Sequence, residues 1–270
     1  LKKKGISFYT DSDTEVVANS YMYWGKKMFN YFDGMWAISI YDEKKDEIIL
    51  SRDYVGQKPL FYLKRKSYIY FSSCLKSLSV DKENEFKIDK DNLKKYLIMS
   101  HLPAPHTLYK NIYQVEPGQN IIINLKNLEI KKEKYWDIEN GPDYNIFFKK
   151  NDKKEFKEVF KKVTLQHAVA DKSPAILLSG GLDSSTITAL AHKLEPRLDI
   201  HTFSNSVGRD DTEITDDTHL SDELCTLYNL KNTKVDDQGR SFVDQVIDVI
   251  SQFPYPTCDT HIMFSHAYKL

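Results

Sequence analysis

The strongest restriction on the fold of this chain comes from a seven-residue segment, Ser179-Gly180-Gly181-Leu182-Asp183-Ser184-Ser185. The apolar segment Ala175–Leu178 before them predicts a short buried strand, and Ser184–Leu194 has the periodicity of a helix. Two adjacent glycines let the backbone turn tightly and approach a ligand without an intervening Cβ atom. The helix N-terminus offers unpaired N–H groups and the positive end of its dipole. The sequence therefore predicts an anion-binding loop between a strand and a helix.

The side chains of this loop suit a pyrophosphate group leaving ATP. Ser179, Ser184 and Ser185 supply hydroxyl donors, whereas Asp183 places a carboxylate beside the expected anion. Because two anionic groups need a cation between them, we expect Mg²⁺ to bridge Asp183 and the phosphate oxygens. The Gly-Lys-Ser/Thr of a Walker A loop is absent. The alternative interpretation is a plain strand-to-helix turn with Asp or Ser as the N-cap.

The predicted order of helices and strands differs between the first and second parts of the chain. The first part predicts an amphipathic helix over Thr14–Phe32 and a helix over Asp91–Ser100. Polar turns separate its strands into three hairpins, which pair Met35–Tyr41 with Glu47–Arg52, Leu60–Leu63 with Tyr68–Ser72, and Asn120–Leu125 with Glu129–Tyr135.

Helices and strands alternate in the second part, which is typical of a parallel sheet with right-handed crossovers. The expected order is helix Glu155–Ala170, strand Ala175–Leu178, helix Ser184–Leu194, strand Leu198–Phe203, helix His219–Leu230 and strand Thr233–Val235. Gly141-Pro142 and the Lys-rich stretch after it mark a linker. We therefore predict domains over residues 1–140 and 155–270, joined by a linker over 141–154, with α+β and α/β character respectively.

Composition excludes several classes of protein. Hydrophobic residues make up 41% of the chain, which excludes global disorder. The net charge of -1 gives no overall positive field for a nucleic acid. No apolar run approaches the roughly 20 residues of a membrane helix. We therefore expect a cytoplasmic protein that binds neither nucleic acid nor membrane.

The cysteines, histidines and acidic residues of the chain do not form a recognisable metal-binding motif. Three widely spaced cysteines, without a CxxC pair, indicate neither a disulfide framework nor a zinc site. We interpret the acidic run over 210–222 as a solvated face rather than a metal cluster, and His167 and His201 belong to no motif.

The loop at 179–185 resembles the pyrophosphate loop of the ATP pyrophosphatase superfamily. Upstream, Phe32–Ile38 and Ser51–Tyr62 resemble the glutaminase domain of the asparagine synthetase family, as do the shorter segments 12–15, 116–118 and 135–137. Taken singly, these segments are weak, since Arg52-Asp53 could be a surface ion pair and Gly56 and Pro59 ordinary turn residues. Their order and spacing beside the loop carry the resemblance across essentially the whole chain.

The resemblance implies a partial αββα N-terminal-nucleophile sandwich followed by a partial adenine-nucleotide α-hydrolase-like domain. It implies asparagine synthesis from aspartate, glutamine and ATP through an aspartyl-adenylate, with AMP and pyrophosphate as products. Asp13 falls where the family holds the α-amino group of glutamine, although it could simply cap the helix that follows. Leu178, Ser204 and Asn205 fall near the adenosine, and Leu178 could equally be a core residue.

Parts of the family pattern are missing. The family's glutaminase nucleophile is an N-terminal cysteine, and Cys74, Cys225 and Cys258 all lie far from the start of this chain. We therefore expect a chain cut at both ends that does not hydrolyse glutamine by itself, since that chemistry needs an activated thiol. The sequence leaves open a homodimer, another carboxylate as acceptor, and a noncatalytic nucleotide-binding fragment.

Overall fold

A computed structural model describes residues 1–79, 87–140, 152–168, 170, 172–205, 218–235 and 241–252. The chain forms two compact units, Leu1–Pro142 and Asp143–Leu270, and each is described by itself. The predicted linker over 141–154 lies mostly outside the described residues, so its bounds stay a prediction.

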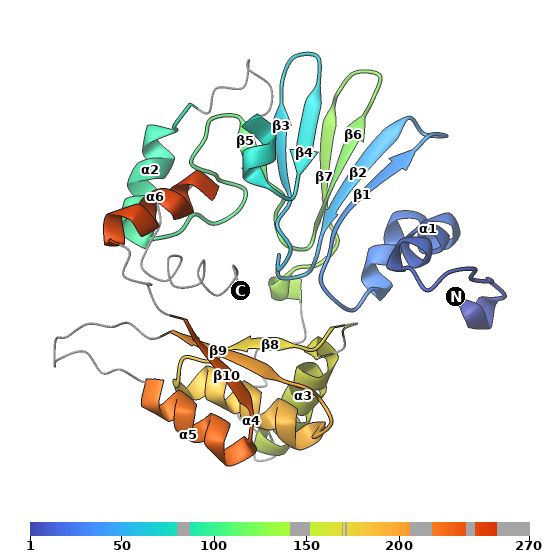
Figure 1. Cartoon of the computed structure of the whole chain (residues 1–270). Helices are drawn as coiled ribbons and strands as arrows, with labels where there is room; N and C mark the ends of the chain where they lie inside the picture. The colour runs from blue at the N-terminus through green and yellow to red at the C-terminus, as the bar shows by residue number, and fades with distance from the viewer. Residues whose placement is uncertain are drawn as a thin grey trace. The chain divides into compact units, whose positions relative to one another are not determined.

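The first unit contains a four-stranded antiparallel sheet in the order β1-β2-β6-β7 (Figure 1). Its strands are β1 (Ala37–Asp42), β2 (Glu47–Arg52), β6 (Gln119–Asn124) and β7 (Ile130–Lys134). The two hairpins predicted here are confirmed, because β1 pairs with β2 and β6 pairs with β7. Strand β6 also pairs with β2, so the two hairpins join into one sheet.

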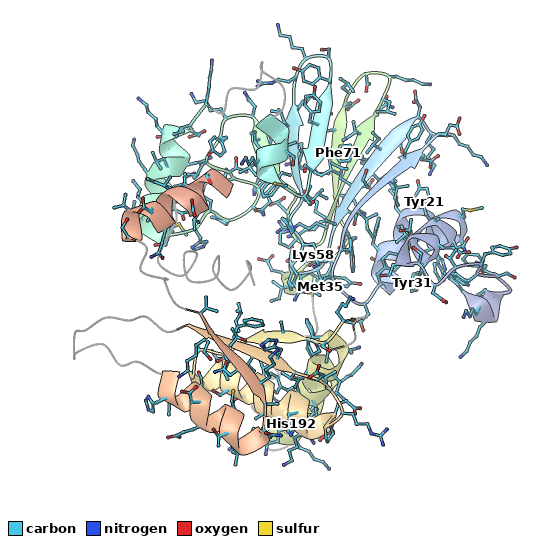
Figure 2. All side chains as sticks on the ribbon, viewed as in Figure 1. Tyr21, Tyr31, Met35, Lys58, Phe71 and His192 are labelled. Carbon is cyan, nitrogen blue, oxygen red and sulfur yellow. The ribbon has the colours of Figure 1, made fainter. Side chains whose placement is uncertain are left out.

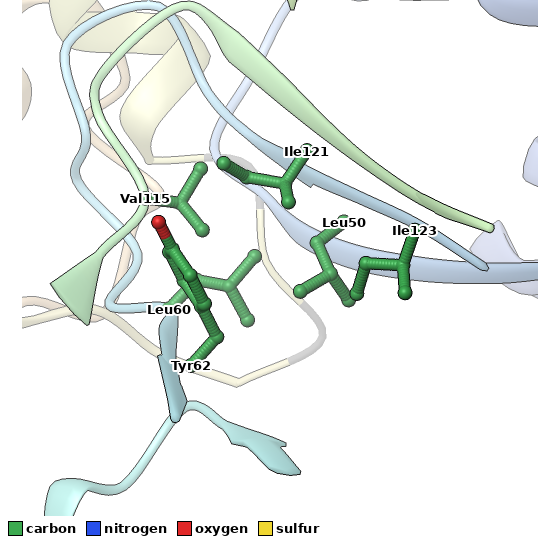
Figure 3. Packing of buried hydrophobic residues seen from close by; sticks show 6 residues of the cluster. All are labelled: Leu50, Leu60, Tyr62, Val115, Ile121 and Ile123. Carbon is green, nitrogen blue, oxygen red and sulfur yellow. The ribbon is translucent and has the colours of Figure 1, made fainter. Parts of the chain in front are cut away.

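A second, three-stranded antiparallel sheet has the order β4-β3-β5. It consists of β3 (Phe61–Lys64), β4 (Ile69–Ser72) and β5 (Ile112–Gln114). The β3–β4 hairpin was predicted, whereas β5 was missed. Residues from both sheets form one buried hydrophobic cluster, which Figure 3 shows from close by: Leu50, Leu60, Tyr62, Val115, Ile121 and Ile123.

The other face of the larger sheet carries a second cluster beneath the N-terminal helices. Since side chains alternate along a strand, Ile49 and Ile122 point away from Leu50 and Ile121. They pack with Met28, Phe29 and Trp36. These five positions fix the helical segment against the sheet.

The predicted helix over Thr14–Phe32 is two elements. Helix α1 covers Asp13–Trp24, and the 3₁₀ helix η2 covers Gly25–Tyr31. Gly25 adopts φ 57° and ψ -144°, a conformation open mainly to glycine, and the α-helix ends there. The break turns Met28 and Phe29 into the core, where both are fully buried.

The interpretation of Arg52-Asp53 as a surface ion pair is wrong. Arg52 is 6% exposed and donates to the carbonyl oxygens of Lys58, Val115 and Gly56 at 2.8, 2.7 and 2.6 Å. Asp53 is 1% exposed and accepts three backbone N–H groups. Burial lowers the pKa of Arg52. Both charges are therefore satisfied by the backbone and shape the turn over 56–59.

Four short elements complete the first unit. Helix α2 (Lys90–Met99) confirms the predicted helix, and Asp89 caps it by accepting from the N–H groups of Asp91 and Asn92. The 3₁₀ helices are η1 (Lys2–Lys4), η3 (Leu75–Ser79) and η4 (Ile138–Asn140).

The second unit has a parallel sheet in the order β10-β9-β8, with helices along it (Figure 1). Its elements are α3 (Asp152–His167), β8 (Ala175–Leu177), α4 (Leu182–Leu194), β9 (His201–Asn205), α5 (Thr218–Tyr228), β10 (Lys231–Val235) and α6 (Phe242–Gln252). The predicted alternation and parallel pairing are confirmed. Helix α6 was not predicted.

Two details of this unit differ from the prediction. Strand β9 begins at His201 rather than Leu198, since Leu198 lies in a turn and donates to Glu195. Strand β8 is not buried along its length: Ala175 is exposed and Leu177 is 37% exposed. Within the described sheet β8 pairs only with β9, so it lies at an edge.

The structure is thus of mixed α and β type with several sheets, as predicted at that level. No helix among the described residues is both long and apolar enough to cross a membrane. Nor do those residues contain a group of three or more His, Cys, Asp or Glu side chains that could hold a metal ion. Cys74 is exposed, Cys225 is buried, and Cys258 lies outside the described residues.

Candidate functional site

The loop predicted to bind pyrophosphate leaves the sheet at the carboxyl end of β8. Leu178 extends the pairing with β9 by one residue, because its N–H donates to the Phe203 carbonyl at 2.8 Å. Its side chain is 1% exposed. In open parallel sheets, ligands bind outside the carboxyl ends of the strands. The loop therefore starts from a fixed point at the edge where a ligand is expected.

Serine side chains fold the loop back on itself. Ser184 Oγ accepts from the backbone N–H of Ser179 at 3.2 Å and lies 3.0 Å from Ser179 Oγ. Ser179 Oγ in turn accepts from the N–H of Gly181 at 3.3 Å. Gly180 between them has φ 82°, a left-handed conformation that a side chain would strain. The predicted residues 179, 180, 181 and 184 are thus brought together in one closed turn.

The first backbone N–H groups of helix α4 have no side-chain cap. Its N-cap is Gly181, which supplies no side-chain cap, and the first backbone bond of the helix is Ser185 N–H to Gly181 O at 3.1 Å. The Asp or Ser N-cap of the alternative interpretation is therefore wrong. The N–H groups of the first turn keep their capacity to bind an anion, at the positive end of a 13-residue helix.

Asp183 and Ser185 lie in that first turn. Asp183 is exposed and makes no hydrogen bond or ion pair with the described residues. A carboxylate without a protein partner fits the oxygen ligand that Mg²⁺ prefers, and it stands beside the N–H groups that would face phosphate oxygens. Ser185, two positions further along the helix, is half-buried.

The expected adenosine neighbours lie on β8 and β9. Leu178 is a buried residue that immediately precedes the loop, and its position beside the adenosine stays a prediction. The Ser204 hydroxyl is buried and donates to Asn232 Oδ1 at 3.1 Å, so it already has a protein partner. Asn205 ends β9 opposite Val235, and its side chain lies outside the described part of the structure.

Helix α5 supplies contacts to this site that the sequence did not indicate. Ser221 is fully buried, and its hydroxyl donates to the Leu178 carbonyl at 3.2 Å. One turn later, Cys225 Sγ lies 3.3 Å from Thr202 Oγ1 of β9. Asp222 forms an ion pair with Lys234 of β10 at 2.6 Å, and the other aspartates of the acidic run over 210–222 lie outside the described residues.

The first unit contains a cavity of about 1040 Å³ at the N-terminal end of α1. Asp13 lines it as the first residue of the helix. The N-cap is Ser12, whose hydroxyl accepts from Thr14 N–H, so the interpretation of Asp13 as the cap is wrong. The lining also includes Tyr31, Met35 and Lys58, labelled in Figure 2.

Two carboxylates outside the lining fix segments that carry lining residues. Asp53 Oδ2 accepts from the N–H groups of both Trp36 and Lys58, at 3.2 and 2.9 Å, and so joins two lining segments. Glu15 accepts from Thr10 Oγ1 at 2.5 Å and from the backbone of Tyr9, and these bonds lower the pKa of Glu15. Asp13 is thereby placed on a helix whose start is tied to the preceding loop.

The chain is thus a two-unit protein of mixed α and β structure. A two-sheet antiparallel unit with a carboxylate-lined cavity is followed by a parallel α/β unit with a glycine-serine loop. Two family models match the chain, a glutamine amidotransferase domain over residues 1–136 and an asparagine synthase domain over residues 155–268. The chain belongs to the asparagine synthetase (glutamine-hydrolysing) family.

Named relatives agree with this assignment. A putative asparagine synthetase (glutamine-hydrolyzing) 2 of Methanocaldococcus jannaschii is 38% identical over 76% of this chain and 40% of its own length. Asparagine synthetases (glutamine-hydrolyzing) 3 and 1 of Bacillus subtilis are 29% and 28% identical, over 76% and 96% of this chain and 33% and 40% of their own lengths. The chain thus spans at most 40% of these relatives.

Proposed function

We propose that the natural protein containing this chain is an ATP-dependent amidotransferase that makes asparagine from aspartate, glutamine and ATP. The observation that carries the proposal is the open N-terminus of α4 behind the closed serine turn, in a chain of the asparagine synthetase family. Adenylation suits the reaction, because a carboxylate accepts nitrogen only after one of its oxygens becomes part of a leaving group.

The proposed chemistry has two steps at the loop. An oxygen of the aspartate side-chain carboxylate attacks the α-phosphorus of ATP, and the bond to the pyrophosphate oxygen breaks. Ammonia then attacks the acyl carbon of the aspartyl-adenylate, AMP leaves with the bond's electron pair, and the nitrogen loses a proton. The first-turn N–H groups of α4 and the Ser179 and Ser184 hydroxyls would hold the departing pyrophosphate.

Mg²⁺ would neutralise charge on the pyrophosphate oxygens, and Asp183 is the side chain proposed to hold it. Asp183 would do this without losing a protein partner, since it has none among the described residues. Leu178, Ser204 and Asn205 are proposed to lie beside the adenosine because they are at or next to the carboxyl ends of β8 and β9. Of these, Ser204 could contribute only through its backbone while its hydroxyl stays bonded to Asn232.

Glutamine is the proposed nitrogen source, and the cavity of the first unit is its proposed binding site. The Asp13 carboxylate would form an ion pair with the α-amino group of glutamine. The thiol that cleaves glutamine in the family belongs to an N-terminal cysteine, and Cys74 of the first unit is not among the residues that line the cavity. The αββα sandwich and the α-hydrolase-like domain are proposed as the folds of the whole protein's two parts.

AMP release tests this function directly. The natural gene product is supplied with ATP, Mg²⁺ and glutamine, with and without aspartate, and AMP and glutamate are measured. We expect AMP only when aspartate is present, in amounts equal to the asparagine formed. Glutamate release without aspartate-dependent AMP would refute aspartate as the acceptor and favour another carboxylate. ADP as the nucleotide product would refute adenylation.

A further inference from the structure

We propose that Ser221 is a positioning residue for the ATP site, through its hydrogen bond to the peptide from which the 179–185 loop departs. This inference rests on the proposed function. Ser221 lies in the first turn of α5, and no side-chain atom of it is exposed to solvent. It is 43 positions from Leu178 in the sequence, so its contact with the loop exists only in the folded unit.

The Leu178–Ser179 peptide is held at both of its polar ends. The carbonyl of Leu178 and the N–H of Ser179 belong to the same peptide, which is rigid and planar. Ser221 Oγ donates to that carbonyl at 3.2 Å, while Ser184 Oγ accepts from that N–H at 3.2 Å. The two bonds therefore fix both polar ends of the peptide and set the direction in which the loop leaves β8.

The fixed peptide determines where the ligand-binding groups lie. Ser184 Oγ also contacts Ser179 Oγ at 3.0 Å, and Ser179 Oγ accepts from Gly181 N–H at 3.3 Å. A rotation of the Leu178–Ser179 peptide would displace both hydroxyls and the glycine N–H together. Preorganised donors are effective because they need no rearrangement when the charged group arrives.

Helix α5 is itself anchored, so Ser221 can act as a fixed reference. Cys225, one turn further along, lies against Thr202 of β9, and Asp222 is paired with Lys234 of β10. Side chains of α5 thus contact Leu178, which follows β8, as well as β9 and β10. With Ser221 replaced by alanine, the helix would keep its contacts to β9 and β10, and only the bond to the loop peptide would be lost.

The test compares Ser221→Ala with Thr226→Ala in the natural protein. Thr226 is on the same helix, but its hydroxyl donates to the Asp222 carbonyl at 2.8 Å within α5 and touches no part of the loop. We expect Ser221→Ala to lower kcat/KM for ATP about tenfold, the change that follows from one hydrogen bond of about 1.4 kcal/mol. Glutamine hydrolysis should stay within about twofold, and Thr226→Ala should leave both activities unchanged.

Binding of Mg²⁺ and inorganic pyrophosphate, measured by calorimetry, provides a readout independent of turnover. The calorimetry is done well below the temperature at which the variant unfolds. Under these conditions Ser221→Ala should weaken the binding of Mg²⁺ and pyrophosphate by a similar factor, about tenfold. Ser221→Cys, which keeps a weak donor of similar size, should fall between the wild type and alanine, and it replaces the alanine variant if that does not fold. An unchanged kcat/KM for ATP and unchanged pyrophosphate binding in either variant would overturn the inference. Absence of AMP formation by the wild type would instead overturn the proposed function.

Discussion

A Gly56→Ala substitution is expected to destabilise the first unit by about 3 kcal/mol. Gly56 has φ +69°, and a Cβ atom added there would lie 2.9 Å from Arg52 Cζ and 3.0 Å from Arg52 Nε and Nη2. The guanidinium is buried and bonded to three carbonyl oxygens, so it has little room to move. The substitution therefore strains the backbone and displaces a buried charge at once.

The two costs set the magnitude. A left-handed conformation costs a non-glycine residue about 1–2 kcal/mol. Displacing the guanidinium weakens its bond to Gly56 O, which is 2.6 Å long, and hydrogen bonds of charged groups contribute about 1.5–3 kcal/mol each. Relaxation of the neighbouring loop would recover part of the sum, which gives the value of about 3 kcal/mol.

Urea unfolding followed by tryptophan fluorescence measures this change. The three tryptophans of the chain, Trp24, Trp36 and Trp136, all lie in the first unit, so their emission reports on that unit. Gly5→Ala is the matched control, because Gly5 has φ +81° but a Cβ there meets no atom within 4 Å. A loss in Gly56→Ala below about 1 kcal/mol, or equal to that of Gly5→Ala, would show that Arg52 is not held as described.

Three further predictions concern the cavity, the loop and the half-buried carboxylate of Asp42. Asp13→Asn should raise the KM for glutamine more than about tenfold and leave ammonia-dependent synthesis unchanged, since it removes one charged contact; an equal loss with ammonia would contradict the role. Gly180→Ala should lower kcat/KM for ATP at least about tenfold because φ is 82° there, with steady-state kinetics as the assay. Hydrogen bonds from Tyr21 and then Lys45 lower the pKa of Asp42 to about 2. The stabilisation from the ionised Asp42 is therefore present above the ordinary value of 3.8 and is lost as the pH falls through about 2. Tyr21→Phe should therefore raise the pKa of Asp42 and flatten the pH dependence of the urea midpoint over that interval; an unchanged acid limb would argue against this bond.

Local patterns predicted most of the fold because they act over short distances. The turn over Asp42–Asp46 fixed the β1–β2 hairpin, and the alternating rhythm of the second part fixed a parallel sheet. Strand β5 was missed because it has three residues, too few for a period to show. The predicted helix ended too late, at Phe32. The helical spacing of apolar residues continues past Gly25, whereas the α-helical backbone of α1 ends at Trp24.

The candidate site divides in the same way. The sequence predicted the 179–185 loop as a contiguous string, and the structure closes it through its own serines. The sequence did not indicate Ser221, whose contact spans 43 positions. The structural roles of Arg52 and Asp53 depend on burial, which no local pattern determines. The sequence left open a surface ion pair, whereas both side chains are buried and hold the turn over 56–59 from beneath it.

AMP formation by an Asp183→Ala variant of the natural protein, measured beside glutamine hydrolysis, tests the central claim most directly. Asp91→Ala is the matched control, because Asp91 is also an exposed carboxylate in the first turn of a helix. The account predicts that Asp183→Ala abolishes AMP formation, that glutamine hydrolysis persists, and that Asp91→Ala changes neither. AMP formation at the wild-type rate in Asp183→Ala would contradict the assignment of the 179–185 loop as the ATP site.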